Sequence, residues 1–238
     1  MKHKISFLIL ILLTSACSVE VKDKKEAQPI DVQKLSVTDY LIDSAVTLTE
    51  DQTLEADRLI LTKNAVITTE SYNLTIIAKE IVSEGGVIRQ FADEARASWE
   101  QNGRSGKMIT LKAKKASGQL RIELRGEAGG NGRNGRRLIA TLNLSRVIDK
   151  GCPGSGGGRG GDAGVLYADI ADMRALNMNW KNDEGTMGNA GIGFSASPGD
   201  QNAIQTPCDH QVQGGNGQPG SKGKICLKAA NQESFQCL

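Results

Sequence analysis

Short apolar runs separated by turn residues fill the chain from about residue 37 to residue 125. They are rich in Leu, Ile, Val and Thr, which favour a pleated, half-buried backbone. The pattern predicts strands at residues 46–49, 54–61, 65–69, 74–82, 87–91, 109–113 and 120–124. This part of the protein is therefore predicted to be mainly β.

Three of these runs share one pattern: threonine, an aliphatic residue, any residue, alanine, two charged residues and an apolar residue. The copies begin at Thr53, Thr75 and Thr110, and the first two begin 22 residues apart. That spacing suits one coil of a parallel β-solenoid, with alanine at a tight corner. A polar insert at 93–107 fills the longer gap before the third copy and is expected to bulge out as a loop or short helix. An antiparallel sandwich is the alternative.

After residue 125 the alternation gives way to glycine at every third position. Four runs keep this spacing, at 126–135, 151–160, 185–191 and 214–223. A polyproline II chain has three residues per turn, so each run presents one bare edge that another backbone can approach. The runs are predicted to pack as side-by-side rods, with the connecting segments covering the end or flank of the solenoid. Flexible glycine loops are the alternative.

The first residues have the pattern of an export signal. A basic start with Lys2 and Lys4 is followed by an apolar stretch too short to span a bilayer, and then by small residues before Cys17. This resembles a bacterial lipoprotein signal with its lipobox. The resemblance implies cleavage before Cys17, lipid on that cysteine, a membrane anchor and, because Ser18 follows, sorting to the outer membrane. An ordinary secretory signal cut nearby is the alternative.

The glycine runs also resemble a known arrangement. They are similar to the glycine-rich domains of some phage tail adhesins and antifreeze proteins, in which short Gly-x-x segments pack as polyproline-II-like helices. A collagen-like trimer is a second alternative, although collagen needs longer arrays with more proline. The predicted organisation is a signal peptide at 1–16, a lipidated cysteine and flexible tether at 17–36, a β-solenoid-like domain at 37–125 and a glycine-rich, disulfide-bonded domain at 126–238.

Charge and cysteine content change this picture little. The formal net charge is +2, and removing Lys2 and Lys4 with the signal leaves 27 basic and 27 acidic residues, which argues against a general nucleic-acid binder. Four cysteines follow Cys17, an even number that indicates two disulfides in an exported chain. Of the three pairings that four cysteines allow, we favour the short-loop pairing within this set: Cys226 with Cys237, and Cys152 with Cys208.

Motifs for cofactors and metals are weak. Gly130-x-Gly132-x-x-Gly135 matches a dinucleotide fingerprint, but the triplet repeat generates it and no acidic residue follows about 20 positions on. Asp162 lies in a stretch similar to a calcium-binding nonapeptide, without the next repeat. The cysteines lack a Cys-x-x-Cys pair for metal ligation. We therefore expect no cofactor and no metal.

Hydrolytic motifs are equally weak. His210 is the only histidine outside the signal, and no nucleophile elbow accompanies it. Ser221-x-x-Lys224 fits a four-residue pattern that is common by chance. Solenoids also carry glycan-cleaving enzymes with paired acids. The candidates for such a pair are Asp57, Glu80, Asp93 and Glu94.

The sequence thus favours a lipid-anchored outer-membrane surface protein, not an enzyme, that acts as a structural or adhesive recognition module. Its partners would be the membrane and a polysaccharide, peptidoglycan or surface protein. A carbohydrate-active enzyme with two acids is the alternative. The candidate contact residues are polar side chains of the triplet runs and one tryptophan of the insert: Asn131, Arg133, Asn134, Arg159, Gln218, Lys222 and Trp99.

Overall fold

The computed structural model describes residues 39–143, 146–194, 213–228 and 232–238. The predicted signal, the lipidation site at Cys17 and the tether lie outside these residues. So do Cys208 and His210. The predictions that depend on them therefore stay predictions.

The described chain is mainly β, as predicted, and contains no helix. Its main sheet follows the order β1-β3-β5-β6-β9-β10-β11, with β2 and β4 paired beside it, and it does not close on itself. The bounds are β1 Asp39–Ile42, β2 Ala45–Thr47, β3 Gln52–Leu61, β4 Val66–Thr68, β5 Leu74–Arg89, β6 Met108–Arg125, β9 Val165–Asp183, β10 Lys224–Lys228 and β11 Gln236–Cys237. All pairs in this sheet are parallel except β10 with β11, so the antiparallel sandwich is wrong for these strands.

The sequence repeat corresponds to a stack of equivalent positions. Thr53 pairs with Thr75 and Thr75 with Thr110, and the alanines of the same pattern pair in the same way. Because side chains alternate between the two faces of a strand, this register places the aliphatic residues of each copy on one face. Leu54, Ile76 and Leu111 are buried together in the core.

Two pairs of predicted strands are single long strands in the structure. Residues 74–82 and 87–91 both contribute to β5, and residues 109–113 and 120–124 both lie in β6. Gly85 and Gly118 have φ values of 112° and 89°, in the left-handed region that glycine tolerates. These glycines let each strand bend without ending the backbone pairing.

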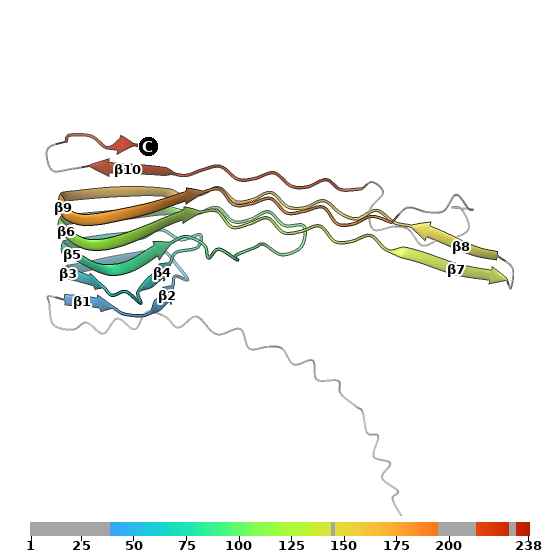
Figure 1. Ribbon diagram of the computed structural model, residues 1–238, viewed down its shortest axis with the longest axis horizontal. Coiled ribbons are helices and arrows are strands. Elements are labelled where there is room, and N and C mark those ends of the chain that lie inside the picture. Colours follow the sequence, from blue (N-terminus) through green and yellow to red (C-terminus); the bar gives the residue numbers. More distant parts are fainter. Residues whose placement is uncertain (1–38, 144–145, 195–212, 229–231) are drawn as a thin grey trace, which may run out of the picture.

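The insert at 93–107 contains no helix and is a loop that runs out from the sheet and back. It leaves the end of β5, runs alongside residue 128 and returns to β6. The Ala97 N–H donates to Ala128 O, and the Ala128 N–H donates to Ala95 O. The connectors differ from the prediction. β7 (Arg137–Asn143) and β8 (Arg146–Gly151) pair at the far end from the sheet, and β9 is part of the sheet itself (Figure 1).

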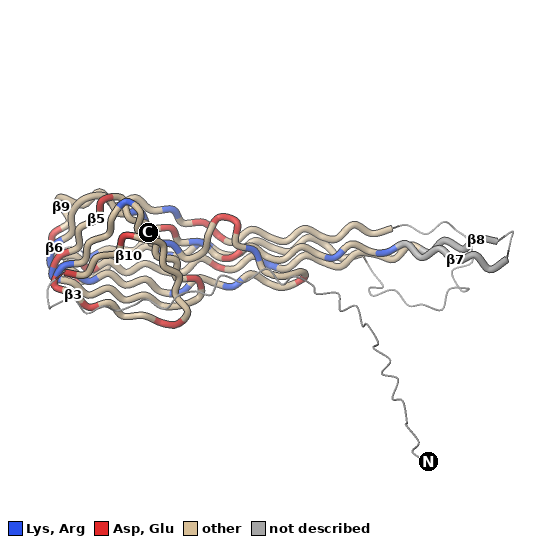
Figure 2. Tube along the Cα trace, turned by 90° about the horizontal axis from the view of Figure 1, so that it is seen from below, with Lys and Arg blue, Asp and Glu red and all other residues tan. Residues whose placement is uncertain are grey.

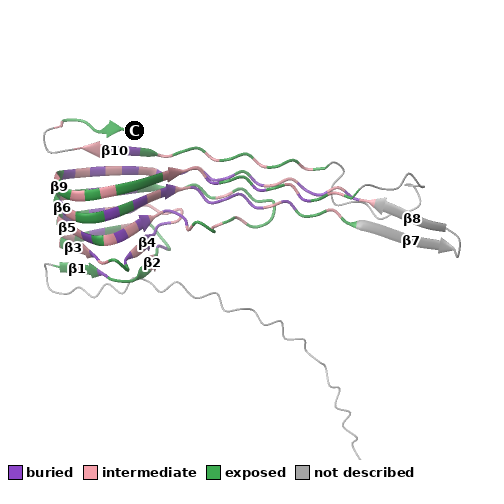
Figure 3. Ribbon diagram, viewed as in Figure 1, coloured by how far each residue is buried: buried purple, intermediate pink, exposed green. Residues whose placement is uncertain are grey.

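Six extended segments continue from the sheet, and backbone hydrogen bonds join each one to its neighbours (Figures 1 and 2). The first row consists of 95–100, 126–135 and 185–194, which run away from the sheet. The second row consists of 101–106, 152–164 and 213–223, which return to it. Buried residues extend from the sheet into these segments (Figure 3).

The bonds within and between the rows show a regular pattern. In the first row Gly129 N donates to Thr186 O at 2.8 Å, and in the second Gly160 N donates to Gln218 O at 2.7 Å. Between the rows Gly158 N donates to Gly130 O at 2.7 Å. Each pair of outgoing and returning segments is thus hydrogen-bonded to the next pair over the length that the two have in common.

The predicted disulfide between Cys226 and Cys237 is confirmed. It joins β10 to β11, and these two strands also pair with each other in an antiparallel direction. Cys152 is also disulfide-bonded. Its predicted partner, Cys208, lies outside the described residues.

Candidate functional site

The polar side chains of the six segments first serve the backbone. Between residues 157 and 163, the N–H groups at five positions donate to carbonyls of neighbouring segments, and those of Arg159 and Asp162 donate to side chains. In the second row, Asn102 Oδ1 accepts the N–H of Arg159 at 2.8 Å, and Asp162 Oδ1 accepts that of Ser221 at 2.7 Å. The side chains that the sequence leaves at non-glycine positions therefore satisfy backbone groups that neighbouring backbones do not reach.

Two of the predicted contact residues in the first row also accept hydrogen bonds from backbone N–H groups. Asn131 Oδ1 accepts the N–H of Asn189 at 3.1 Å and a guanidinium hydrogen of Arg96 at 3.2 Å. Asn134 Oδ1 accepts the N–H of Ile192 at 2.8 Å. Both carbonyl oxygens are therefore used inside the protein, and the amide NH2 groups are the parts left to meet a ligand.

The predicted contact residues divide between the two rows. Trp99, Asn131, Arg133 and Asn134 belong to the first row. The remaining three, Arg159, Gln218 and Lys222, belong to the second row and are exposed. Arg159 forms an ion pair with Asp162 at 2.7 Å, which also orients the carboxylate that accepts the Ser221 N–H. The structure therefore does not bring all seven residues into one site.

Two of the first-row contact residues, Arg133 and Asn134, do meet, at the point where the insert ends and the longer segments continue past it. A hollow of about 210 Å³ lies there, and it is lined by Glu100, Arg133, Asn134, Gly135, Arg136, Cys152 and Pro153. Arg133 Nε lies 4.0 Å from a carboxylate oxygen of Glu100. Trp99 precedes Glu100 in the chain and is 58% exposed.

The backbone of this hollow is held firmly. Glu100 has a φ of 66°, an uncommon value for a residue with a side chain, and its N–H donates to Asn131 O at 2.9 Å. The Arg133 N–H donates to Ser155 Oγ at 2.7 Å. A non-glycine residue keeps a left-handed conformation only where its surroundings impose it, and such residues cluster at functional sites.

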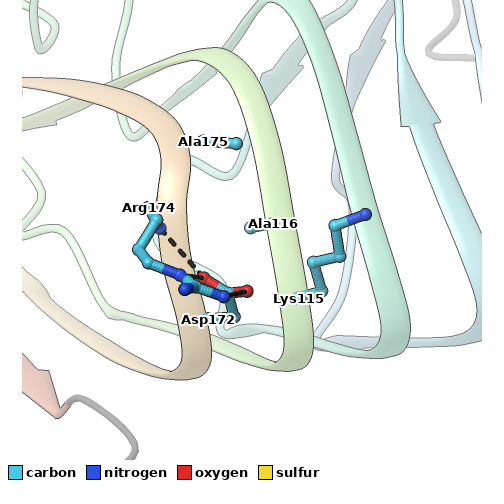
Figure 4. Close-up of a pocket in the computed structure, with 5 residues that line it drawn as sticks. All are labelled: Lys115, Ala116, Asp172, Arg174 and Ala175. Atoms are coloured by element: carbon cyan, nitrogen blue, oxygen red, sulfur yellow. Dashed lines mark hydrogen bonds and ion pairs between the residues drawn. The ribbon is translucent and has the colours of Figure 1, made fainter.

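A second, more open hollow lies on the sheet, where one extra residue of β9 faces β6 (Figure 4). Lys115 and Ala116 come from β6, and Asp172, Arg174 and Ala175 come from β9. The guanidinium of Arg174 lies on the carboxylate of Asp172, and the closest Arg174–Asp172 atoms are 2.8 Å apart. Hydrogen bonds from Arg174 hold the pKa of Asp172 well below its ordinary value. Arg174 and Asp172 neutralise each other, so this hollow is the weaker candidate for a binding site.

Three of the four acids considered for glycan cleavage lie beside cations. Glu80 is between Arg58 and Lys115, at 3.5 and 3.3 Å, and Asp57 accepts from Lys79 at 2.7 Å. Asp93 pairs with Arg125 and Lys181, and Glu94 is exposed. Among the described residues no group of three or more His, Cys, Asp or Glu side chains has the arrangement of a metal site.

Sequence reasoning missed an ion pair at the base of the segments. Glu127 is 6% exposed, and its two carboxylate oxygens accept from Arg104 Nε at 2.9 Å and Nη2 at 3.0 Å. Arg104 also binds Glu70 at 2.8 Å. Burial raises the pKa of Glu127, but the hydrogen bonds and charge of Arg104 outweigh it, so that the pKa is lowered overall.

This ion pair gives a pH prediction. Because the pKa of Glu127 is lower in the folded than in the unfolded chain, its contribution to the free energy of unfolding is complete above the unfolded value of about 4.3. The contribution is lost as the pH falls from there through the folded pKa. We expect Glu127→Gln to reduce the slope of the free energy of unfolding against pH between about pH 2.5 and pH 6, as measured by urea denaturation at each pH. The matched Glu84→Gln, at an exposed position of β5, should leave the slope unchanged, and equal slopes in both variants would refute the assignment.

Within the described ranges there is no helix with the length and hydropathy needed to cross a membrane. Comparison of the chain with models of protein families, with curated proteins and with solved structures gave no match. The six segments and the hollow at the end of the insert are therefore the features that bear on function.

Proposed function

We propose that this protein is a lipid-anchored surface protein of the outer membrane, and that its glycine-rich part is a rigid adhesion or recognition module. Cys17 would carry the lipid, and residues 17–36 would hold the folded part away from the membrane. The parallel strands would form one side of a small β-solenoid. The six segments would be polyproline-II-like rods that together form a bundle.

One observation carries the proposal: most glycines of the segments lie where neighbouring backbones meet. A Cβ atom on Gly126 would overlap the carbonyl oxygen of Gly161, and one on Gly160 would overlap that of Gly185. Backbone groups joined this closely lose most of their freedom when the chain folds, before any ligand arrives. A rigid surface pays less ordering entropy on binding, which suits recognition of an extended or repetitive partner.

Two measurements test this function. Mass spectrometry of the protein from bacterial membranes should show a chain that begins at an acylated Cys17. The purified mature chain, applied to glycan arrays and to pull-downs from cell envelopes, should retain a polysaccharide, peptidoglycan or surface protein. An unmodified Cys17 contradicts the anchor, and arrays and pull-downs that both return nothing contradict the recognition module.

A further inference from the structure

The lining of the hollow at the end of the insert contains more positive than negative side chains. Glu100 supplies one negative charge, and Arg133 and Arg136 supply two positive charges. No Asp or Glu occurs between residues 128 and 148, whereas arginine occurs at 133, 136, 137 and 146. A concentration of one sign of charge attracts ligands of the other sign.

The donors in the hollow suit a planar carboxylate. A guanidinium group presents five N–H donors in a fixed fork that matches the two oxygens of a carboxylate. Arg133 Nε lies 4.0 Å from a carboxylate oxygen of Glu100, and the Arg133 side chain is 68% exposed. This long contact leaves N–H groups of Arg133 able to turn toward a ligand while Glu100 keeps the head group near the hollow.

The neighbouring groups suit a sugar. Because Asn134 Oδ1 is bound to the Ile192 N–H, its NH2 group is held as a donor at a fixed place. Glu100 adds a carboxylate acceptor, and Trp99 adds an exposed aromatic face beside it in the chain. An aromatic face binds the apolar side of a ring, whereas carboxylate and amide groups bind hydroxyls.

We propose that this hollow binds a carboxylate-bearing sugar of an acidic polysaccharide. Arg133 and Arg136 donate to the sugar carboxylate, Asn134 and Glu100 bond its hydroxyls, and Trp99 lies against a ring at the rim. The volume of about 210 Å³ suits one sugar unit. This inference rests on the proposed recognition function and names its ligand class.

Isothermal titration calorimetry with charged and uncharged forms of the same sugar tests the ligand class. The purified mature chain is titrated with trigalacturonate and trimannuronate, and with their methyl esters, which keep the rings and remove the charge. We expect at least one acid to bind about tenfold or more tightly than its ester, because the ester cannot form the charge-assisted bonds. Equal affinities, or no binding of either acid, overturn the proposal.

Substitutions then test the place. Arg133→Gln and Trp99→Ala should each weaken binding of the acid about tenfold or more, and Arg133→Gln should also reduce the preference over the ester. Arg174→Gln, which removes an exposed, carboxylate-paired arginine from the hollow on the sheet, should bind as the unaltered chain does. An unaltered thermal midpoint shows that each variant is folded, and a folded Arg133→Gln variant with full affinity refutes the site.

The two proposals can fail separately. If the arrays show a bound neutral glycan or a protein, and Arg133→Gln does not change that binding, the recognition module stands and the acidic-sugar site falls. If neither glycans nor envelope proteins bind, the proposed function falls as well.

Discussion

Replacing Gly158 by alanine should destabilise the protein by about 3 kcal/mol or more, one of the largest effects expected of a single added methyl group. Gly158 lies in the second row, where other segments surround it. A Cβ atom there would overlap the carbonyl oxygen of Gln101. The Gly158 N–H also donates to Gly130 O at 2.7 Å, and its carbonyl accepts from Gly188 at 2.9 Å. The backbone therefore cannot move away without breaking bonds to two further segments.

Gly215→Ala is the matched control. Gly215 belongs to the same row and its carbonyl accepts from Gly157, but a Cβ atom there has nothing within 4 Å. Because alanine restricts the unfolded chain more than glycine does, this variant should be unchanged or more stable by up to about 1 kcal/mol. Urea denaturation followed by circular dichroism compares the two. Equal losses in both variants would show that the glycines are not close-contact positions.

Gln90→Leu should also cost about 3 kcal/mol or more, because it leaves several buried backbone groups without partners. Gln90 is fully buried at the end of β5, where the sheet passes into the segments. Its Nε2 donates to Lys107 O at 2.7 Å, and its Oε1 accepts from the N–H groups of Arg125 and Gly164 at 3.1 and 2.9 Å. One side chain thus joins three parts of the chain at this junction.

The control here is Gln119→Leu, in the bend of β6. Gln119 is exposed, and the bond recorded for it is made by its backbone carbonyl, which accepts from Ser83 Oγ and is kept in the variant. Its free energy of unfolding should therefore change by no more than about 0.5 kcal/mol. A Gln90→Leu variant as stable as Gln119→Leu would mean that water replaces the lost amide bonds at the junction.

Some of the glycine patterns that allow segments to lie next to one another are present in the sequence, but they span only a few residues. Gly103 and Gly106 keep the three-residue spacing inside the insert. A Cβ atom on Gly103 would overlap the backbone of Glu127, and one on Gly106 would overlap the buried side chain of Gln90. The second row has adjacent glycines at 157–158 and 160–161. Along 152–164 two edges of the segment meet other backbones, so two positions in three lack a side chain there.

The candidate hollow was predictable only in part. Arg133, Asn134 and Trp99 stand out as polar or aromatic residues near glycine positions, and the structure brings the first two together. Glu100 and Arg136 had no local signal. They join the lining because the insert ends beside residue 131 while the longer segments continue, and the length at which a segment ends relative to its neighbour is not encoded by any short pattern.

The sequence by itself determined what depends on local periodicity: the strand composition, the register of the threonine and alanine repeat, the three-residue glycine spacing and the favoured pairing of Cys226 with Cys237. Tertiary structure alone decided that the insert runs out and back as two more segments, that β5 and β6 bend without breaking, and that Gln90 bonds three distant backbone groups. The physical reason is that a sequence period specifies which edge of a segment faces inward. The partner of each backbone N–H depends on which segments, far apart in sequence, come to lie side by side in the folded protein.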